Sequence, residues 1–164
     1  MLSPLIYGID LEQKLKVAYL GRLLNYVTWP SSVEWSESKS FNICIIGTAS
    51  FNKLLGSLSS RKLVKEKPVD IRYFDNVEES SNCHLLFISI SEQAKITQIL
   101  KFTKNKPILT IGETRGFAEK NGMIQFLMKG QKVYMKINYE AYRNHSFTIS
   151  SDLFALSNVT VINR

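Results

Sequence analysis

The first element that the pattern of apolar residues predicts is a helix over residues 10–28. Apolar positions recur there at roughly helical spacing, as expected for a helix that buries one face. Asp10 has a side chain suited to an N-cap, and Trp29-Pro30 ends the pattern because proline cannot continue a helix. The apolar positions of the stripe are Leu11, Leu15, Ala18, Leu23 and Val27.

Short apolar runs then alternate with helical stretches up to residue 111. Continuous apolar runs predict strands that are buried on both faces, and this alternation is typical of βαβ units with a parallel sheet. Residues 31–40 and the basic segment 61–67 are predicted to be exposed loops. The predicted strands are 41–47, 69–74, 83–89 and 108–111, and the helical patterns are the stripe Phe51, Leu54, Leu55, Leu58 and residues 92–103.

After Gly122 the pattern changes to that of a β-hairpin. Residues 123–128 and 132–138 have strand patterns, and Gly130 lies in the turn between them. In the second strand apolar residues alternate with polar ones such as Lys136, as expected for one buried and one solvated face.

The chain closes with a predicted helix over residues 153–156, capped at Ser150, and with residues 159–162 as a strand or an extended tail. We therefore predict an α/β fold: one domain spanning residues 1–164, with a mixed, partly parallel β-sheet flanked by helices, a C-terminal β-hairpin and short helices.

Composition fits one globular domain. The chain has 164 residues, 45% apolar and 21% charged, and folding at this length buries roughly 70% of the surface. The net charge is +7, of which residues 83–164 carry +6, so an acidic partner is expected to contact the second half. The lysines and arginines are scattered and match no nucleic-acid-binding motif, so we expect no nucleic acid partner.

The residues alone give no sign of a membrane span or of export. No apolar run reaches the roughly 18 residues that a span needs. Residues 1–10 lack the basic start, apolar core and cleavage site of a signal peptide. An exported protein whose signal peptide has been removed gives the same pattern.

Catalytic and metal-binding patterns are absent from the sequence. No serine lies in a G-x-S-x-G motif, and the strand neighbours Cys83 and His84 point to opposite faces. Glu113 and Glu119 are six residues apart, a spacing that does not place them on one helix face. The cysteines and histidines have no zinc-binding spacing. We expect no enzyme activity, metal or cofactor, with His84 at a strand end and His145 in a loop.

The two cysteines, Cys44 and Cys83, lie 39 residues apart in the two most apolar runs. Their spacing fits two buried thiols and a disulfide equally well. A bridge closing so long a loop would restrict the unfolded chain by about 4 kcal/mol. Oxidation would require a location outside the cytoplasm.

A series of short motifs runs from the first helix to Leu156. The motifs are Tyr26-Val27-Thr28-Trp29-Pro30, Phe41-Asn42-Ile43-Cys44-Ile45-Ile46-Gly47, Lys67-Pro68, Cys83-His84-Leu85-Leu86-Phe87-Ile88-Ser89, Pro107-Ile108-Leu109-Thr110-Ile111-Gly112, Gly116-Phe117-Ala118-Glu119, Gly122-Met123-Ile124-Gln125-Phe126, Ile137-Asn138 and Ile149-Ser150-Ser151-Asp152-Leu153. Their order and spacing are more specific than any one of them, and together they make the sequence resemble the YfiR-like family of periplasmic regulators.

The resemblance implies a periplasmic mixed α/β domain without catalytic activity. The best-known members bind the periplasmic sensor region of a membrane diguanylate cyclase and hold it inactive, and stress that relieves this inhibition raises cyclic di-GMP and promotes biofilm formation. Cys44 and Cys83 match a pair that the family joins as a disulfide, which implies a bridge and a redox-responsive regulator. Charge changes on a binding surface alter the choice of partner. The departures from the family pattern are Asn121, Gln125, Lys136, Asp152, Ser157 and Asn158.

We expect the second half to bind the cyclase through Lys136, Tyr142 and Phe154. The hairpin and the last helix are predicted to expose these side chains, and a basic, aromatic set suits an acidic protein patch. The alternative for the two aromatic residues is a place in the core. The alternative function is an extracytoplasmic small-molecule sensor domain, and a small-molecule ligand and a homodimer are further expectations.

Overall fold

The structure is a computed structural model that describes residues 4–48 and 53–164. An eight-stranded sheet with the order β10-β8-β7-β6-β5-β2-β4-β3 forms the body, and β1 and β9 make a separate pair. The strands are β1 Val27–Thr28, β2 Phe41–Ile46, β3 Lys62–Val64, β4 Lys67–Phe74, β5 Leu85–Ile88, β6 Leu109–Gly112, β7 Ile124–Lys129, β8 Lys132–Asn138, β9 Thr148–Ile149 and β10 Val159–Ile162. The helices are α1 Pro4–Leu23, α2 Ile96–Thr103, α3 Tyr139–Asn144 and α4 Ser151–Phe154, with 3-10 turns η1 Trp35–Glu37, η2 Leu55–Leu58, η3 Val77–Ser80 and η4 Ile90–Lys95.

The central strands are parallel and the C-terminal ones are mixed. Strands β4, β2, β5, β6 and β7 pair in parallel, in that order. Strands β7 and β8 form the antiparallel hairpin, and β10 adds in parallel to β8 at one edge. The predicted α/β fold with a mixed, partly parallel sheet and a C-terminal hairpin is confirmed, and residues 159–162 form a strand.

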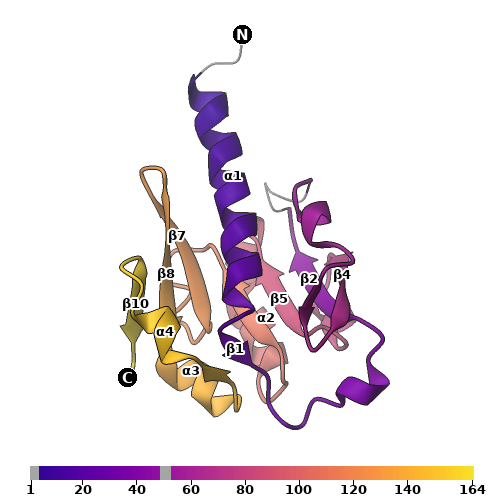
Figure 1. Ribbon diagram of the computed structural model, residues 1–164. Helices are drawn as coiled ribbons and strands as arrows, with labels where there is room; N and C mark the ends of the chain where they lie inside the picture. Colours follow the sequence, from indigo (N-terminus) through magenta and orange to yellow (C-terminus); the bar gives the residue numbers. More distant parts are fainter. Residues whose placement is uncertain (1–3, 49–52) are drawn as a thin grey trace.

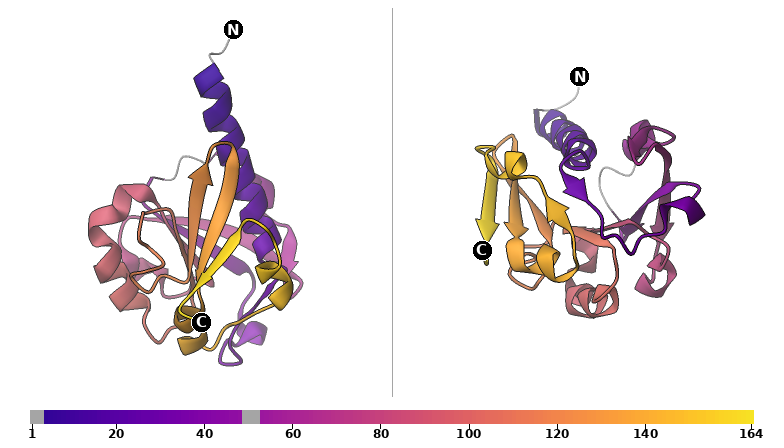
Figure 2. Two further views of the ribbon diagram at one scale, coloured as in Figure 1. Left: turned by 90° about the vertical axis from the view of Figure 1, so that its left-hand side faces the viewer. Right: turned by 60° about the horizontal axis from the view of Figure 1, so that its bottom comes forward.

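Helix α1 and helix α2 cover opposite faces of the sheet (Figures 1 and 2). In β2, Phe41, Ile43 and Ile45 belong to the core that includes α1, whereas Cys44 and Ile46 belong to the core that includes α2. Successive residues of a strand point to opposite faces, so a strand covered on both sides is apolar throughout. The continuous apolar runs of the sequence follow from this two-sided burial.

Helix α1 does not coincide with the predicted helix over residues 10–28. It runs from Pro4 to Leu23, so Asp10 lies inside the helix and the prediction is wrong at both ends. Pro4 suits the first helical position, where no backbone amide is needed. At the other end, β1 pairs with β9 from the far end of the chain, and this non-local pairing stops the helix before Trp29-Pro30.

The predicted loop over residues 61–67 is a second hairpin. Strand β3 pairs with β4 in antiparallel fashion, and Lys65 and Glu66 between them have positive φ values of 52° and 56°. Tight hairpin turns often need positive φ at both central residues, and Asn-Gly usually signals it. Without that signal, the sequence did not reveal the hairpin.

The helices between the strands are shorter than predicted. Helix α2 begins at Ile96, because the backbone of Glu92 breaks the preceding 3-10 segment. Leu55–Leu58 form only the 3-10 turn η2, and Phe51 lies outside the described residues.

Side-chain caps fix the short C-terminal helices. The Asn138 side chain accepts a hydrogen bond from the Ala141 backbone N–H at 3.0 Å and begins α3, a helix that was not predicted. Ser150 caps α4 as predicted, by accepting from the Asp152 backbone N–H at 3.3 Å. Helix α4 begins and ends two residues before the predicted range 153–156.

Candidate functional site

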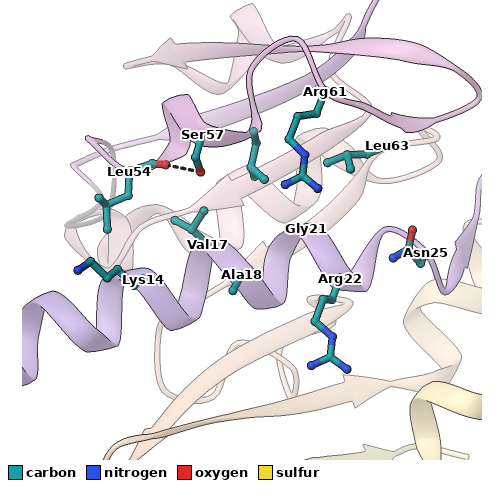
Figure 3. A pocket seen from close by; sticks show the side chains of 11 residues that line it. Lys14, Val17, Ala18, Gly21, Arg22, Asn25, Leu54, Ser57, Arg61 and Leu63 are labelled. Carbon is teal, nitrogen blue, oxygen red and sulfur yellow. Dashed lines mark hydrogen bonds between the residues drawn. The ribbon is translucent and has the colours of Figure 1, made fainter.

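A groove of about 510 Å³ lies between α1 and the segment from η2 to β3 (Figure 3). We call it the α1 groove. On the α1 side of the groove, Gly21 has no side chain. An added Cβ there would lie 3.3 Å from the Leu58 Cδ2 atom, so α1 and η2 approach closely at this point. The apolar part of the lining consists of Val17, Ala18, Leu54, Leu58 and Leu63. Such a volume and lining are typical of small-molecule sites.

Lys14, Arg22 and Arg61 also line the groove, and none of the described lining residues is acidic. The Arg61 side chain extends from the loop between η2 and β3 toward α1 and ends near Gly21, whereas Arg22 points to the other side of the helix (Figure 3). Across residues 4–48 and 53–164, neither of these arginines forms a side-chain hydrogen bond or ion pair. The groove therefore combines an apolar trough with an uncompensated guanidinium.

A buried ion pair joins α1 to the loop after β6. The Lys16 ammonium lies 2.7 Å from a carboxylate oxygen of Glu113 and 2.9 Å from one of Glu12. Burial alone would lower the pKa of Lys16, but hydrogen bonds and the charges of the two carboxylates outweigh it and raise the pKa above its ordinary value. Lys16 is thus charged and already neutralised within the fold.

The cysteine pair is a disulfide. Cys44 on β2 and Cys83 just before β5 are joined, with their Cα atoms 5.9 Å apart. The bridge lies in the core on the α2 side of the sheet, and both cysteines are buried. The bond implied by the family resemblance is therefore confirmed, and it links two adjacent strands.

His84 follows the disulfide and is held firmly in the fold. Its Nδ1 accepts a hydrogen bond from the Asn42 backbone N–H at 2.9 Å, and its carbonyl accepts one from Trp29 Nε1 at 2.9 Å. The imidazole stacks on Trp35 with the ring centroids 4.9 Å apart. Burial, with the charge of Arg72 as the smaller cause, lowers the pKa of His84 from 6.5 to about 4. The ring is neutral at pH 7 and its Nδ1 atom is already engaged.

Lys136 lies on the polar side of β8, as its pattern predicts. Its ammonium is 2.6 Å from a carboxylate oxygen of Glu119, and its side chain is 27% exposed. The hydrogen bond from Lys136 lowers the pKa of Glu119 below its usual value. Exposed ion pairs of this kind contribute little to stability, so an acidic partner could compete with Glu119 for the lysine. A binding role for Lys136 stays a prediction.

Tyr142 and Phe154 lie together, but not as predicted. Tyr142 is 2% exposed, so the prediction of an exposed side chain is wrong and the alternative core position is correct. The cap at Asn138 sets the orientation of α3, and Tyr142 then faces the core four residues later. Phe154 is half-buried and its ring stacks on Tyr142, with 6.5 Å between centroids. In the described part of the chain, no hydrogen bond, ion pair or ring contact joins either residue to Lys136.

Phe154 belongs to a small aromatic and basic surface, which we call the C-terminal face and define as Tyr139, Arg143, Phe154 and Arg164. The Arg143 guanidinium lies 5.7 Å from the Tyr139 ring centroid. The Arg164 guanidinium lies 5.9 Å from the Tyr139 ring and 5.6 Å from the Phe154 ring. The four-residue spacing of Tyr139 and Arg143 would have revealed a shared helix side had α3 been predicted. Arg164 has no local signal, since β10 brings it there.

Two classes of feature are not found. Residues 4–48 and 53–164 contain no group of three or more His, Cys, Asp or Glu side chains that could hold a metal ion. No helix among the same residues is long and apolar enough to cross a membrane.

The chain matches the YfiR/HmsC-like family over residues 13–158. No curated protein matches it. It is similar in structure to a conserved domain protein from Vibrio cholerae O1 biovar El Tor strain N16961, with a TM-score of 0.59 and 12% identity over 97% of this chain and 60% of that one. It is also similar to the ABC domain in complex with L-Trp from Streptococcus pneumonia, with a TM-score of 0.57 and 9% identity over 92% of this chain and 60% of that one. The chain thus spans 60% of the length of each, and at such identities the likeness shows the fold alone.

Proposed function

The chain belongs to the YfiR/HmsC-like family, and on that premise we propose that it is a periplasmic regulator that represses a membrane diguanylate cyclase. It binds the periplasmic sensor region of the cyclase, without catalysis of its own, and so controls cyclic di-GMP signalling and biofilm formation. The observation that carries the proposal is the family match, which extends from the middle of α1 to the turn before β10. The disulfide supports an oxidising compartment and a redox-responsive form of the regulator.

The C-terminal face and Lys136 are the surfaces that we assign to the partner. Tyrosine and arginine are enriched among residues that dominate binding energy, and the C-terminal face presents both beside Phe154. Its two arginines attract an acidic patch and steer the encounter, while the aromatic rings supply apolar contact. Tyr142 contributes indirectly, because its buried ring stacks on Phe154 and holds that side chain in position.

The test is binding of the full chain to the periplasmic region of a diguanylate cyclase from the same organism, measured by calorimetry at low and high salt. We expect Lys136→Glu and Arg143→Glu each to weaken binding at least tenfold at low salt and less at high salt. Lys95→Glu is the matched control, because Lys95 is also an accessible lysine paired with an acid, Glu92 at 3.6 Å, but lies on η4. We expect it to bind like the wild type and all variants to melt within a few degrees of it.

The outcomes separate the parts of the proposal. Wild-type affinity in both variants would show that the interface lies elsewhere on the protein. No binding by the wild-type chain would refute the cyclase as partner. In cells, deletion of the gene should raise cyclic di-GMP, and Arg143→Glu should do so partially. The predicted homodimer is checked in the same samples by light scattering.

A second candidate function is sensing of a small molecule outside the cytoplasm. The α1 groove favours it, because an apolar trough beside a guanidinium has the makeup of a ligand site.

A further inference from the structure

We propose that the α1 groove binds an aliphatic monocarboxylate, with the carbon chain along α1 and the carboxylate on Arg61. The inference concerns a ligand and does not depend on the identity of the protein partner. It rests on the shape of the groove, on its apolar floor and on the position of one unpaired guanidinium.

The floor and rim of the groove suit a flexible carbon chain. Val17 and Leu58 are almost fully buried and form the floor, whereas Leu54 and Leu63 are half-buried and still have apolar surface to cover. Ala18 is exposed on the helix side and adds only a methyl group, which leaves the trough open above it. The lining extends along α1 from Lys14 to Arg22, about 12 Å at 1.5 Å per residue, and continues to Asn25 just after the helix.

The polar groups of the groove favour a ligand that carries a single negative charge. The Arg61 side chain ends near Gly21, on the side of α1 that faces the groove (Figure 3). A guanidinium binds a carboxylate through two parallel hydrogen bonds. The Ser57 hydroxyl already donates to the Leu54 carbonyl at 2.9 Å, so Arg61 is the donor that the ligand engages. No acidic residue among the described lining opposes an anion.

Charge also argues against a second copy of α1 as the occupant. Among the described side chains of α1, Lys14 and Arg22 are exposed cations, whereas Lys16 is buried and paired with Glu12 and Glu113. A second α1 would therefore bring cations beside Arg61, and like charges at an interface oppose association. A carboxylate on an apolar chain complements both the charge and the floor.

The experiment uses the full chain labelled with ¹⁵N and titrated with decanoate below its micelle concentration. We expect amide shifts confined to residues 14–25, in α1 and just after it, and to the segment from Leu54 to Leu63. Octanoate, decanoate and dodecanoate should bind progressively tighter, by roughly fourfold for each methylene that is buried. Decylammonium, which has the same chain and the opposite charge, should not bind to the groove.

Variants test the two halves of the site separately. Arg61→Gln should weaken decanoate binding at least tenfold, and Arg61→Lys should retain part of it. The control is Arg115→Gln, an exposed arginine outside the groove lining, which should leave the affinity for decanoate unchanged. Ala18→Trp fills the trough from an exposed position and should abolish binding without lowering the melting temperature. Equal binding of decylammonium, shifts scattered over the basic surface, or unchanged affinity in Arg61→Gln would each overturn the proposal. If the chain binds decanoate in the groove but does not bind the cyclase, the result would contradict only the proposed function.

Discussion

Acidification should destabilise the domain through one histidine. His84 is neutral in the folded protein because its pKa falls to about 4, whereas the unfolded chain binds a proton near pH 6.5. Between these values the unfolded state holds more protons, so stability is highest above pH 6.5 and is lost as the pH falls toward 4. Since one pKa unit is equivalent to about 1.4 kcal/mol, the full loss is about 3 kcal/mol.

The structural reason is the hydrogen bond at Nδ1. A proton on Nδ1 would face the Asn42 N–H, which now donates to that atom at 2.9 Å, and the charged ring would be buried at 7% exposure near Arg72. His84→Asn keeps an acceptor close to the Nδ1 position but cannot gain the proton. The variant should be less stable at pH 7, because it loses the stacking on Trp35 and Phe41, yet it should lose less stability than the wild type on acidification.

Urea unfolding at pH 7, 5.5 and 4.5 measures the effect directly. The difference between wild type and His84→Asn should shrink as the pH falls, by roughly 2–3 kcal/mol over the window. The matched control is His145→Asn, which removes the other histidine of the chain and should leave the wild-type pH dependence in place. Parallel curves for wild type and His84→Asn would refute the reasoning, because protonation of another group would then account for the whole loss.

Three further predictions concern the stability of the fold. Replacing Cys44 and Cys83 by alanine should lower the free energy of unfolding by about 4 kcal/mol in urea, since the bridge closes a 39-residue loop; untreated exported protein should contain no titratable thiol, and two thiols would contradict the bridge. Gly122→Ala should cost about 1–3 kcal/mol, because its Cβ would lie 2.2 Å from the Phe117 ring, and Phe117→Leu in the same chain should recover part of the loss in a thermal melt. Lys16→Met should cost about 3 kcal/mol or more in urea, because it leaves a buried carboxylate unpaired; a loss below about 1 kcal/mol would show that the pair is dispensable.

The sheet could be predicted because the amino-acid composition of each strand reflects whether its faces are buried. A strand covered on both faces must be apolar at nearly every position, and Ile43, Cys44 and Ile45 show that pattern without reference to any other segment. The end of α1 and the extra hairpin could not be predicted in this way. The hairpin turn at Lys65 and Glu66 adopts positive φ without glycine or asparagine, and the end of α1 depends on a pairing partner more than 120 residues away.

The candidate site was less predictable than the fold. The cysteines were identified because both lie in apolar runs and match the family pair, but the α1 groove brings Gly21 beside Arg61, and the latter lies in a segment that the pattern assigns to a loop. Tyr142 shows the opposite problem, since a tyrosine on a short helix is buried or exposed according to where the cap turns the helix. Such positions depend on tertiary arrangement and have no local signature.

The bridge between Cys44 and Cys83 also changes what a cut in the backbone means. Between the two cysteines lie β3, β4 and the exposed turn at Lys65 and Glu66, the kind of site where proteases act. Cleavage there breaks the chain but leaves both pieces covalently attached through sulfur, so α1 and β2 stay joined to the strands from β4 onward. The two pieces would part only where the cleaved protein also met a reductant.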